Sequence, residues 1–284
     1  KIAKENNCIF VKFEPNVIAL KGSTLLKQED AKLANFTVKL AADRGHPEFA
    51  RGDAERKNLT TSSFTKIPES EPAKSLFTPY TFQIDLTQSA EELLKNMHPK
   101  TRYNINLARK KDVVIEENNS DEAFEIFQKL TAETTQRQKF FAHTPHYRQL
   151  MWRTMRDSGI ARLLVARYPS AINHSAIQPS NHPLFLSAWV LFFWNGVAYY
   201  PYGASSGKHR ELMASNLLAW EALRLAKKHG YKKFDFWGAL GPNPDKNDPR
   251  YGFHRFKEGY GGKLVEFIGT YDLVIHPFLY KLYN

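Results

Sequence analysis

The stretch LFLSAWVLFFWNGVAYYPY, residues 184–202, decides the fold class. Its first part, Leu184–Trp194, is a nearly continuous apolar run. It predicts a buried strand, because it is far shorter than the ~20 residues that a membrane-spanning helix needs. Asn195-Gly196 is typical of a two-residue hairpin turn. Residues 197–202 then predict a second strand, antiparallel to the first.

Further helices and strands follow one another on both sides of this hairpin. Ser89 and Glu92 have the spacing of a capping box, which predicts the start of a helix, and Gly230 predicts the end of another. The pattern as a whole predicts an α/β fold, a mixed sheet with helices on both faces. The other expected strands are residues 8–13, 77–86, 161–167, 233–237 and 265–268; the expected helices are 90–97, 100–111, 121–136, 143–157, 212–229, 251–258 and 276–283.

The composition restricts the class of protein. Of 284 residues, 42% are hydrophobic and 24% charged, which provides a core and excludes disorder throughout. A single cysteine, Cys8, excludes an intrachain disulfide and a cysteine zinc cluster. The net charge of +11 favours anionic partners: nucleic acid, phosphorylated substrates or an anionic membrane surface. The first residues, KIAKENN, are polar, so we expect no secretory signal and a cytoplasmic protein.

The N-terminal region differs in character from the rest. Residues 21–75 are polar and mixed in charge, which predicts a helix around residues 28–40 and then a long surface loop. The chain begins without Met, and its first seven residues resemble the end of a helix. We therefore expect a fragment of a longer protein.

A run of basic residues between Lys95 and Lys111 contains no acid. On a helix, Arg102 and Arg109 lie roughly on one face, where they could bind phosphates. The alternative is a solvated helix surface.

Tyrosines gather in AYYPYGASSGKHR, residues 198–210, where a small-residue loop follows a strand. Strict alternation places Tyr200 and Tyr202 on one face of the strand and Tyr199 on the other. This arrangement suits a ligand site, with core packing as the alternative for at least one tyrosine.

Lys257 lies in the Gly-rich stretch HRFKEGYGGKL, residues 254–264. Gly259, Gly261 and Gly262 would let a substrate approach the backbone, and a lysine there can neutralise a phosphate or a developing oxyanion. An exposed lysine without function is the alternative. Because exposure is expected in either case, replacing Lys257 should leave stability unchanged.

Motifs of several enzyme classes are missing: there is no G-x-S-x-G, no Walker A, no G-x-G-x-x-G and no H-E-x-x-H. Pro145 interrupts the pair His143 and His146, and no third ligand is apparent, so no metal site is expected. The one R-x-x-G-x-A match, residues 156–161, stands between a helix and the following strand. That order is wrong for the diphosphate site of an acetyl-CoA transferase.

Five segments in this order resemble the Fem family, the aminoacyl-tRNA-dependent transferases that build peptidoglycan interpeptide bridges. The segments are KTRYNINLARK (100–110), TAETTQRQKF (131–140), YYPYGAS (199–205), LLAWEALRLAKKHGYKKFDFWG (217–238) and FHRFKEGYGGKLVEFIG (253–269). The resemblance implies acetyltransferase-like (GNAT-like) domains around a cleft, in an armless and N-terminally truncated member. It divides the chain into an incomplete first domain (1–87, with the polar insertion 21–75), a second domain (88–268) and a return to the first (269–284).

The resemblance also implies site residues. Lys257 matches the lysine of the family's Phe-Lys pair in the cleft, so it is the expected catalytic residue. A tyrosine that contacts the diphosphate of the muropeptide is matched by Tyr147, and His143 stands where the family has an arginine. The expected substrate-binding residues are Phe256, Tyr147, Tyr202, His143 and Arg102.

The implied reaction moves an amino acid from aminoacyl-tRNA to the stem-peptide amine of a peptidoglycan precursor, either lipid II or a UDP-linked muropeptide. The ester is already activated, so the reaction needs no enzyme nucleophile, no metal and no cofactor. A peripheral contact with the inner surface of the membrane is also implied. Two alternatives stay open: a CoA-dependent N-acyltransferase of the same superfold, and a non-catalytic nucleic-acid-binding module that uses the face between Lys95 and Lys111.

Overall fold

The computed structural model describes residues 10–13, 70–73, 78–139, 142–169, 183–267 and 269–283. The chain divides into two compact units, Thr81–Leu264 and a smaller one of Lys1–Tyr80 with Val265–Asn284. Cys8, the helix expected at 28–40 and most of the loop expected at 169–183 lie outside the described residues.

A seven-stranded mixed sheet is the framework of the larger unit, in the order β4-β5-β6-β7-β8-β3-β9. Strand β6 pairs antiparallel with β5 and with β7, which confirms the hairpin at Asn195-Gly196. Strands β7 and β8 are parallel, and β3 is antiparallel to β8. The strands are β3 (Tyr80–Asp85), β4 (Val114–Glu117), β5 (Ala161–Tyr168), β6 (Leu184–Trp194), β7 (Val197–Ser205), β8 (Lys233–Asp235) and β9 (Lys263–Glu266).

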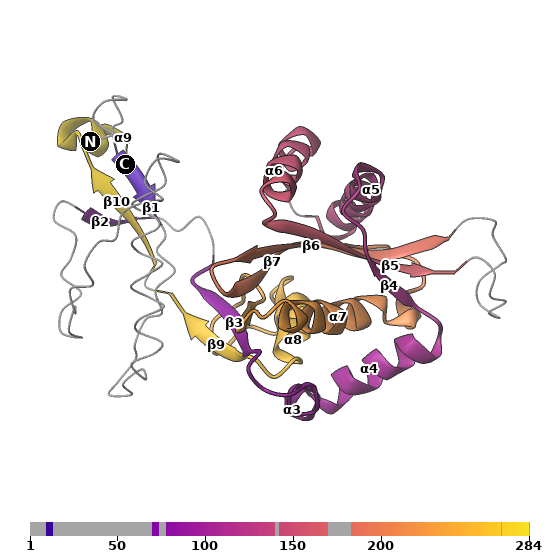
Figure 1. Cartoon of the computed structure of the whole chain (residues 1–284). Helices are drawn as coiled ribbons and strands as arrows, with labels where there is room; N and C mark the ends of the chain where they lie inside the picture. The colour runs from indigo at the N-terminus through magenta and orange to yellow at the C-terminus, as the bar shows by residue number, and fades with distance from the viewer. Residues whose placement is uncertain are drawn as a thin grey trace, which may run out of the picture. The chain divides into compact units, whose positions relative to one another are not determined.

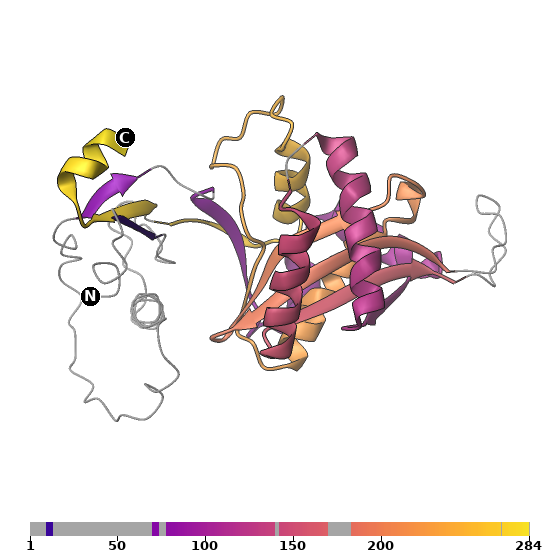
Figure 2. The ribbon, with the colours of Figure 1, turned by 90° about the horizontal axis from the view of Figure 1, so that it is seen from above.

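Helices cover both faces of this sheet, with α5 and α6 on one face and α3, α4, α7 and α8 on the other (Figure 1). Seen from above, α5 and α6 lie across the strands (Figure 2). The predicted α/β class is therefore confirmed. The helices are α3 (Ala90–Asn96), α4 (Pro99–Lys110), α5 (Asp121–Gln138), α6 (Pro145–Asp157), α7 (Ala214–Lys228) and α8 (Tyr251–Glu258), with a 3-10 turn η2 (Arg210–Leu212) before α7.

Side-chain caps explain where several helices begin. The predicted capping box of α3 is confirmed: the Glu92 N–H donates to Ser89 Oγ at 3.1 Å, and the Ser89 N–H donates to Glu92 Oε2 at 2.7 Å. At the start of α5 the Ala123 N–H donates to Ser120 Oγ at 3.1 Å, and at the start of α6 the Tyr147 N–H donates to Thr144 Oγ1 at 3.2 Å. Each cap satisfies an N–H group that has no partner inside its helix.

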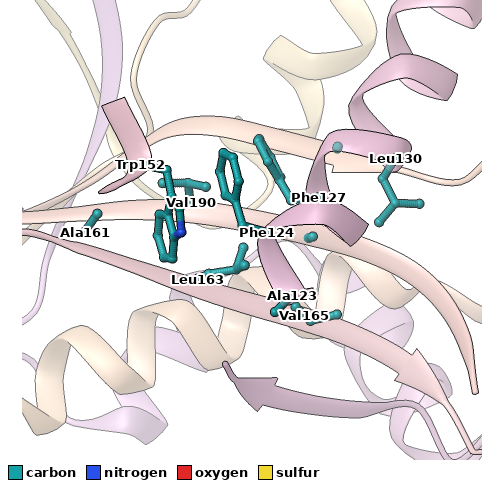
Figure 3. Close-up of a cluster of buried hydrophobic side chains, with 11 residues drawn as sticks. Ala123, Phe124, Phe127, Leu130, Trp152, Ala161, Leu163, Val165 and Val190 are labelled. Carbon is teal, nitrogen blue, oxygen red and sulfur yellow. The ribbon is translucent and has the colours of Figure 1, made fainter. Parts of the chain in front are cut away.

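The core between the sheet and the α5–α6 layer is built around two aromatic rings (Figure 3). Phe124 of α5 and Trp152 of α6 stack with their centroids 5.1 Å apart. Both side chains are fully buried, and they pack over Leu163 of β5 and Val190 of β6. Burying a large apolar side chain contributes about 1.5–3 kcal/mol, so this stack fixes the two helices to the sheet.

A bulge in β7 changes the predicted orientation of its tyrosines. Val190 of β6 pairs with Tyr202 and Phe192 with Tyr199, so two residues of β7 oppose one residue of β6 between these pairs. Pro201 is one of the two, as expected of a residue without a backbone donor. The alternation is interrupted there. Tyr202 packs against the α5–α6 core, whereas Tyr200 stacks on Trp189 and lies near Phe236 on the opposite face. The prediction that Tyr200 and Tyr202 share a face is therefore wrong.

The described part of the smaller unit contains a three-stranded antiparallel sheet. Strand β10 (Thr270–Val274) lies between β1 (Phe10–Phe13) and β2 (Ser70–Ala73), so residues from distant parts of the chain share this sheet. Helix α9 (Pro277–Tyr283) follows β10, and the Tyr280 hydroxyl donates to Asp272 Oδ2 at 3.0 Å. In the described part of the chain, none of the helices combines the length and the apolar character needed to cross a membrane.

Several elements differ from the sequence-based expectation. Strands β2, β4 and β10 were not predicted, because each has only four or five residues and carries acidic side chains; β2 lies within the stretch 21–75, whose end was expected to be a loop. Strand β3, which lies inside the expected first domain of residues 1–87, pairs with β8 in the larger sheet, and the expected domain boundaries stay a prediction. Strand β8 ends at Asp235 rather than at Trp237, because Trp237 takes a left-handed backbone conformation, φ +53°.

We predict that Phe124→Ala lowers the free energy of unfolding by about 3–5 kcal/mol, because it removes the ring that stacks on Trp152 and leaves a cavity. The matched control is Leu150→Ala on the exposed side of α6, where the side chain is 60% exposed. That change should stay within about 0.5 kcal/mol of wild type. Chemical denaturation of the three proteins measures both values, and equal losses would contradict the assignment of the core.

Candidate active site

Lys257, in the last turn of α8, is buried with 7% of its surface exposed. Its Nζ donates to the carbonyl oxygen of Trp237 at 2.7 Å and to that of Gly238 at 2.7 Å. An ammonium group has three donors, so two are used by these carbonyls and one remains. The expectation of an exposed lysine is wrong, because α8 packs this side chain against the turn that follows β8.

The turn at residues 236–240 is fixed at both ends by side chains. At its start, the carboxylate of Asp235 accepts from the N–H of Trp237 at 2.8 Å. At its end, Nδ1 of His254 on α8 accepts from the N–H of Leu240 at 3.1 Å. Between these contacts, Trp237 and Gly238 both have positive φ, +53° and +78°. Their carbonyl oxygens converge on Nζ of Lys257, and we call this pair of carbonyls the lysine cradle.

The cradle lies where two parallel strands separate. Strands β7 and β8 pair over Val197–Tyr199 and Lys233–Asp235 only. Beyond these pairs β7 continues beside β6 to Ser205. The segment that follows β8 instead runs beside β3, because the Phe236 N–H donates to the carbonyl oxygen of Phe82 at 3.0 Å. Residues after Asp235 are thereby free to form the turn instead of a longer strand.

Aromatic rings surround the amine of Lys257. Its Nζ lies 4.8 Å from the ring centroid of Phe253 and 5.7 Å from that of Tyr200. Such positions stabilise a cation through the negative face of the ring. Trp237 and Phe253 are each 37% exposed, so this aromatic site reaches the surface. Phe256 does not face the amine: its ring packs against Tyr260 at 5.4 Å and anchors α8.

Burial controls the ionisation of the groups at this site. Desolvation lowers the pKa of Lys257 to about 7, while the nearby charge of Asp235 opposes the shift. Burial also raises the pKa of Asp235, although hydrogen bonds from Thr81, Gln83 and Trp237 oppose that change. The pKa of Tyr200 is raised by burial as well. A lysine with a pKa near neutrality can change its charge in the physiological range, which is common at catalytic sites.

A second group of predicted residues gathers on the other face of the sheet. The His143 ring lies 4.4 Å from that of Tyr147 at the start of α6 and 6.4 Å from that of Tyr202 on β7. Arg148 holds this arrangement by donating to the carbonyl of His143 and to Gln128 Oε1, the latter at 2.7 Å. The structure thus brings His143, Tyr147 and Tyr202 together, apart from Phe256 and Lys257 on the α8 face.

Arg102 has structural partners. Its Nη1 donates to the carbonyl oxygens of Leu94 and Lys95, at 3.3 and 3.1 Å, and to that of Met97. These are the unpaired carbonyls at the end of α3. Arg109, in the same basic run, forms an ion pair with Glu221 of α7 at 3.1 Å. Phosphate binding by Arg102 remains a prediction.

The glycines near Lys257 face the protein rather than open space. A Cβ at Gly261 would lie 2.4 Å from the carbonyl oxygen of Asn96, and one at Gly259 would lie 2.4 Å from Thr101 Oγ1. A Cβ at Gly262 would lie 3.0 Å from the carbonyl oxygen of Gln83. The expectation that these glycines admit a substrate is therefore wrong, because the end of α3, the start of α4 and strand β3 occupy that space.

Sequence reasoning missed several residues of the site. Asp235, Trp237 and Phe253 stand inside segments that were quoted for other reasons, and only the fold brings them to Lys257. Proline within a predicted strand was the available signal for Tyr200, since it marks a bulge. The described residues include no group of three or more His, Cys, Asp and Glu side chains that could hold a metal ion.

The mixed sheet with two separating parallel strands and helices on both faces defines an acetyltransferase-like protein. The family model of the FemAB family matches residues 69–178 and 171–284. The crystal structure of FemX superimposes with a TM-score of 0.74, at 20% identity, over 99% of this chain and 76% of that one. The lipid II:glycine glycyltransferase of Staphylococcus haemolyticus is 25% identical over 333 residues, which cover 99% of this chain and 72% of that protein. The corresponding protein of Staphylococcus saprophyticus is 33% identical over 120 residues, which cover 42% of this chain and 29% of that protein.

The chain belongs to the FemAB family, since the family model matches well over half of it. The predicted resemblance is therefore confirmed. Membership makes the chain an enzyme of the aminoacyltransferase class.

Gly261 offers a test of the closed packing around the end of α8. We predict that Gly261→Ala lowers the free energy of unfolding clearly more than Gly230→Ala. Both glycines have positive φ, +75° and +80°, so both changes carry a backbone strain of about 1–2 kcal/mol. Only at Gly261 does the new Cβ also clash with a backbone oxygen, whereas nothing lies within 4 Å at Gly230. Urea unfolding of the two variants compares the losses; equal losses would show that the space beside Gly261 is open.

Lys257 should make stability depend on pH. Because its pKa is about 7 in the folded chain and 10.5 for the free side chain, the unfolded state holds one more proton between these values. Stability therefore rises with pH in this window, by up to about 1.4 kcal/mol per pH unit, and this contribution is flat below it. We predict that Lys257→Met removes the rise, while Lys246→Met in an exposed loop keeps it. Denaturant unfolding from pH 6 to pH 9 measures the slopes, and an unchanged slope in Lys257→Met would contradict the assignment.

Proposed function

We propose that this chain transfers an amino acid from aminoacyl-tRNA to the stem-peptide amine of a lipid-linked peptidoglycan precursor. The observation that carries the proposal is the buried amine of Lys257, held by two carbonyls at 2.7 Å where β7 and β8 separate. Family membership and relatives named lipid II:glycine glycyltransferase support this reaction class.

The reaction needs stabilisation of charge more than it needs a nucleophile. The acceptor amine attacks the ester carbonyl, the ester C–O bond breaks, and the proton lost by the amine ends on the departing ribose oxygen. The negative charge of the tetrahedral intermediate resides on the former carbonyl oxygen. In the proposed mechanism the third N–H of Lys257 donates to this oxyanion, in a site where desolvation strengthens the interaction.

Two anionic substrates must be held, and the charge of the chain suits them. The net charge of +11 favours both the tRNA and a diphosphate-linked precursor. We assign His143, Tyr147 and Tyr202 to the precursor, because their rings gather where the start of α6 meets β7. Phe256 is assigned to positioning of α8, and Arg102 to the corner between α3 and α4. A lipid-linked acceptor further implies action at the cytoplasmic face of the membrane.

The test is a transfer assay with charged tRNA and a lipid-linked muropeptide. We predict that Lys257→Met lowers kcat by about 10²–10³, since it removes one electrostatic donor to the oxyanion. The matched control, Lys246→Met, removes a charge from an exposed loop and should keep the wild-type rate.

The same assay separates the alternatives. Transfer by Lys257→Met at the wild-type rate, with unchanged affinity for both substrates, would refute the role of Lys257. Product formed only with acetyl-CoA would indicate a CoA-dependent acyltransferase. Tight tRNA binding without any transfer would indicate a nucleic-acid-binding module.

A further inference from the structure

Asp235 is a buried carboxylate whose hydrogen bonds connect strand β3 with the turn that follows β8. It is 3% exposed. Its Oδ1 accepts from Thr81 Oγ1 at 2.7 Å and from the Trp237 N–H at 2.8 Å, and its Oδ2 accepts from Gln83 Nε2 at 2.9 Å. Thr81 and Gln83 belong to β3, the strand beside β8. The carboxylate is thus held by the sheet and holds the first N–H of the turn.

The turn needs this support because of its backbone conformation. Trp237 has a φ of +53°, which is unfavourable for a residue with a Cβ and a bulky side chain. An aspartate that accepts from the N–H two residues later compensates for such a conformation. The same conformation directs the carbonyls of Trp237 and Gly238 toward Nζ of Lys257.

From this geometry we infer that Asp235 is a positioning residue for Lys257. It fixes the left-handed turn that forms the lysine cradle, and its negative charge favours the ammonium form. Among the described residues, Asp235 and Lys257 form no direct ion pair. Asp235 therefore acts on Lys257 through the backbone of the turn and through the electrostatic attraction between the two charges. The inference concerns the active site of the proposed function, yet the coupling between Asp235 and Lys257 can be measured without any substrate.

Other ionisable groups also face the amine, and the test must separate them from Asp235. They are Tyr200 on β7, whose ring centroid lies 5.7 Å from Nζ, and His254 on α8, whose pKa is lowered by burial and further by the charge of Lys257. Comparing the effect of Asp235→Asn in the presence and in the absence of Lys257 therefore isolates the contribution of Lys257 to the pH dependence of unfolding.

The first measurement is the pH dependence of unfolding, from pH 6 to pH 9, for wild type, Asp235→Asn, Lys257→Met and the double variant. Asparagine keeps an oxygen for the Trp237 N–H, and Gln83 can turn its amide to accept from the new NH₂ group. Losing the carboxylate charge should move the Lys257-dependent rise in stability to lower pH. In the Lys257→Met background, Asp235→Asn should leave the pH dependence unchanged. An unshifted rise, or the same shift in both backgrounds, would overturn the inference.

The second measurement is transfer activity. Asp235→Ala removes the acceptor for the Trp237 N–H, so we expect kcat to fall about 10²-fold with little change in KM, as a displaced catalytic group does. Asp235→Asn should retain more activity, with its pH profile shifted to lower pH. The control is Asp245→Ala, because Asp245 also accepts from the N–H two residues later, that of Asn247, but on the exposed loop before α8.

The outcomes distinguish this inference from the proposed function. A wild-type kcat in Asp235→Ala, or an equal loss in Asp245→Ala, would overturn the positioning role. Where Asp235→Ala does not fold, Asp235→Asn and the unfolding measurement decide. If the wild-type chain transfers no amino acid, the proposed function fails, and the unfolding cycle still shows whether Asp235 acts on Lys257.

Discussion

A primary amine can be buried only where acceptors replace the water that it loses, and this constraint organises the site around Lys257. Two backbone carbonyls meet it here, because the chain after β8 turns back through two residues with positive φ. This turn can form only because β8 ends at Asp235, where the chain separates from β7. The separation of the parallel strands, the turn and the charge of the lysine are therefore parts of one arrangement.

Pro201 has a comparable effect on the tyrosines. A proline cannot donate to the ladder, and the bulge at this position rotates Tyr200 to the α8 face while Tyr202 stays on the α5–α6 face. Strand β7 thereby supplies the ring of Tyr200 to the lysine site and the ring of Tyr202 to the group of His143 and Tyr147. Without the bulge, both rings would lie on one face, and the amine of Lys257 would lose its aromatic neighbour on β7.

The sequence predicted what depends on local patterns. The hairpin at Asn195-Gly196, the capping box of α3 and the mixed sheet follow from turn chemistry, capping and hydrophobic periodicity. The family resemblance indicated Phe256–Lys257 and the group of His143, Tyr147 and Tyr202. The burial of Lys257 and the role of Asp235 could not be predicted, because both depend on which strand neighbours β8. Gly261 was misinterpreted for the same reason: its closest atom belongs to Asn96, far away in the sequence.

The corner between α3 and α4 explains why α8 is held rigidly enough for a reacting group. The His98 N–H donates to the carbonyl of Gly259 at 2.9 Å, directly beyond the last turn of α8. Arg102 closes the same corner by binding the last carbonyls of α3, and Gly261 admits the backbone of Asn96 at close range. An amine on a freely moving helix would lose its fixed distance to the cradle carbonyls. Arg102, which the sequence analysis assigned to substrate binding, thus also helps to hold α8 and Lys257 in position. It does so through hydrogen bonds to the backbone carbonyls at the end of α3, which its positive charge strengthens.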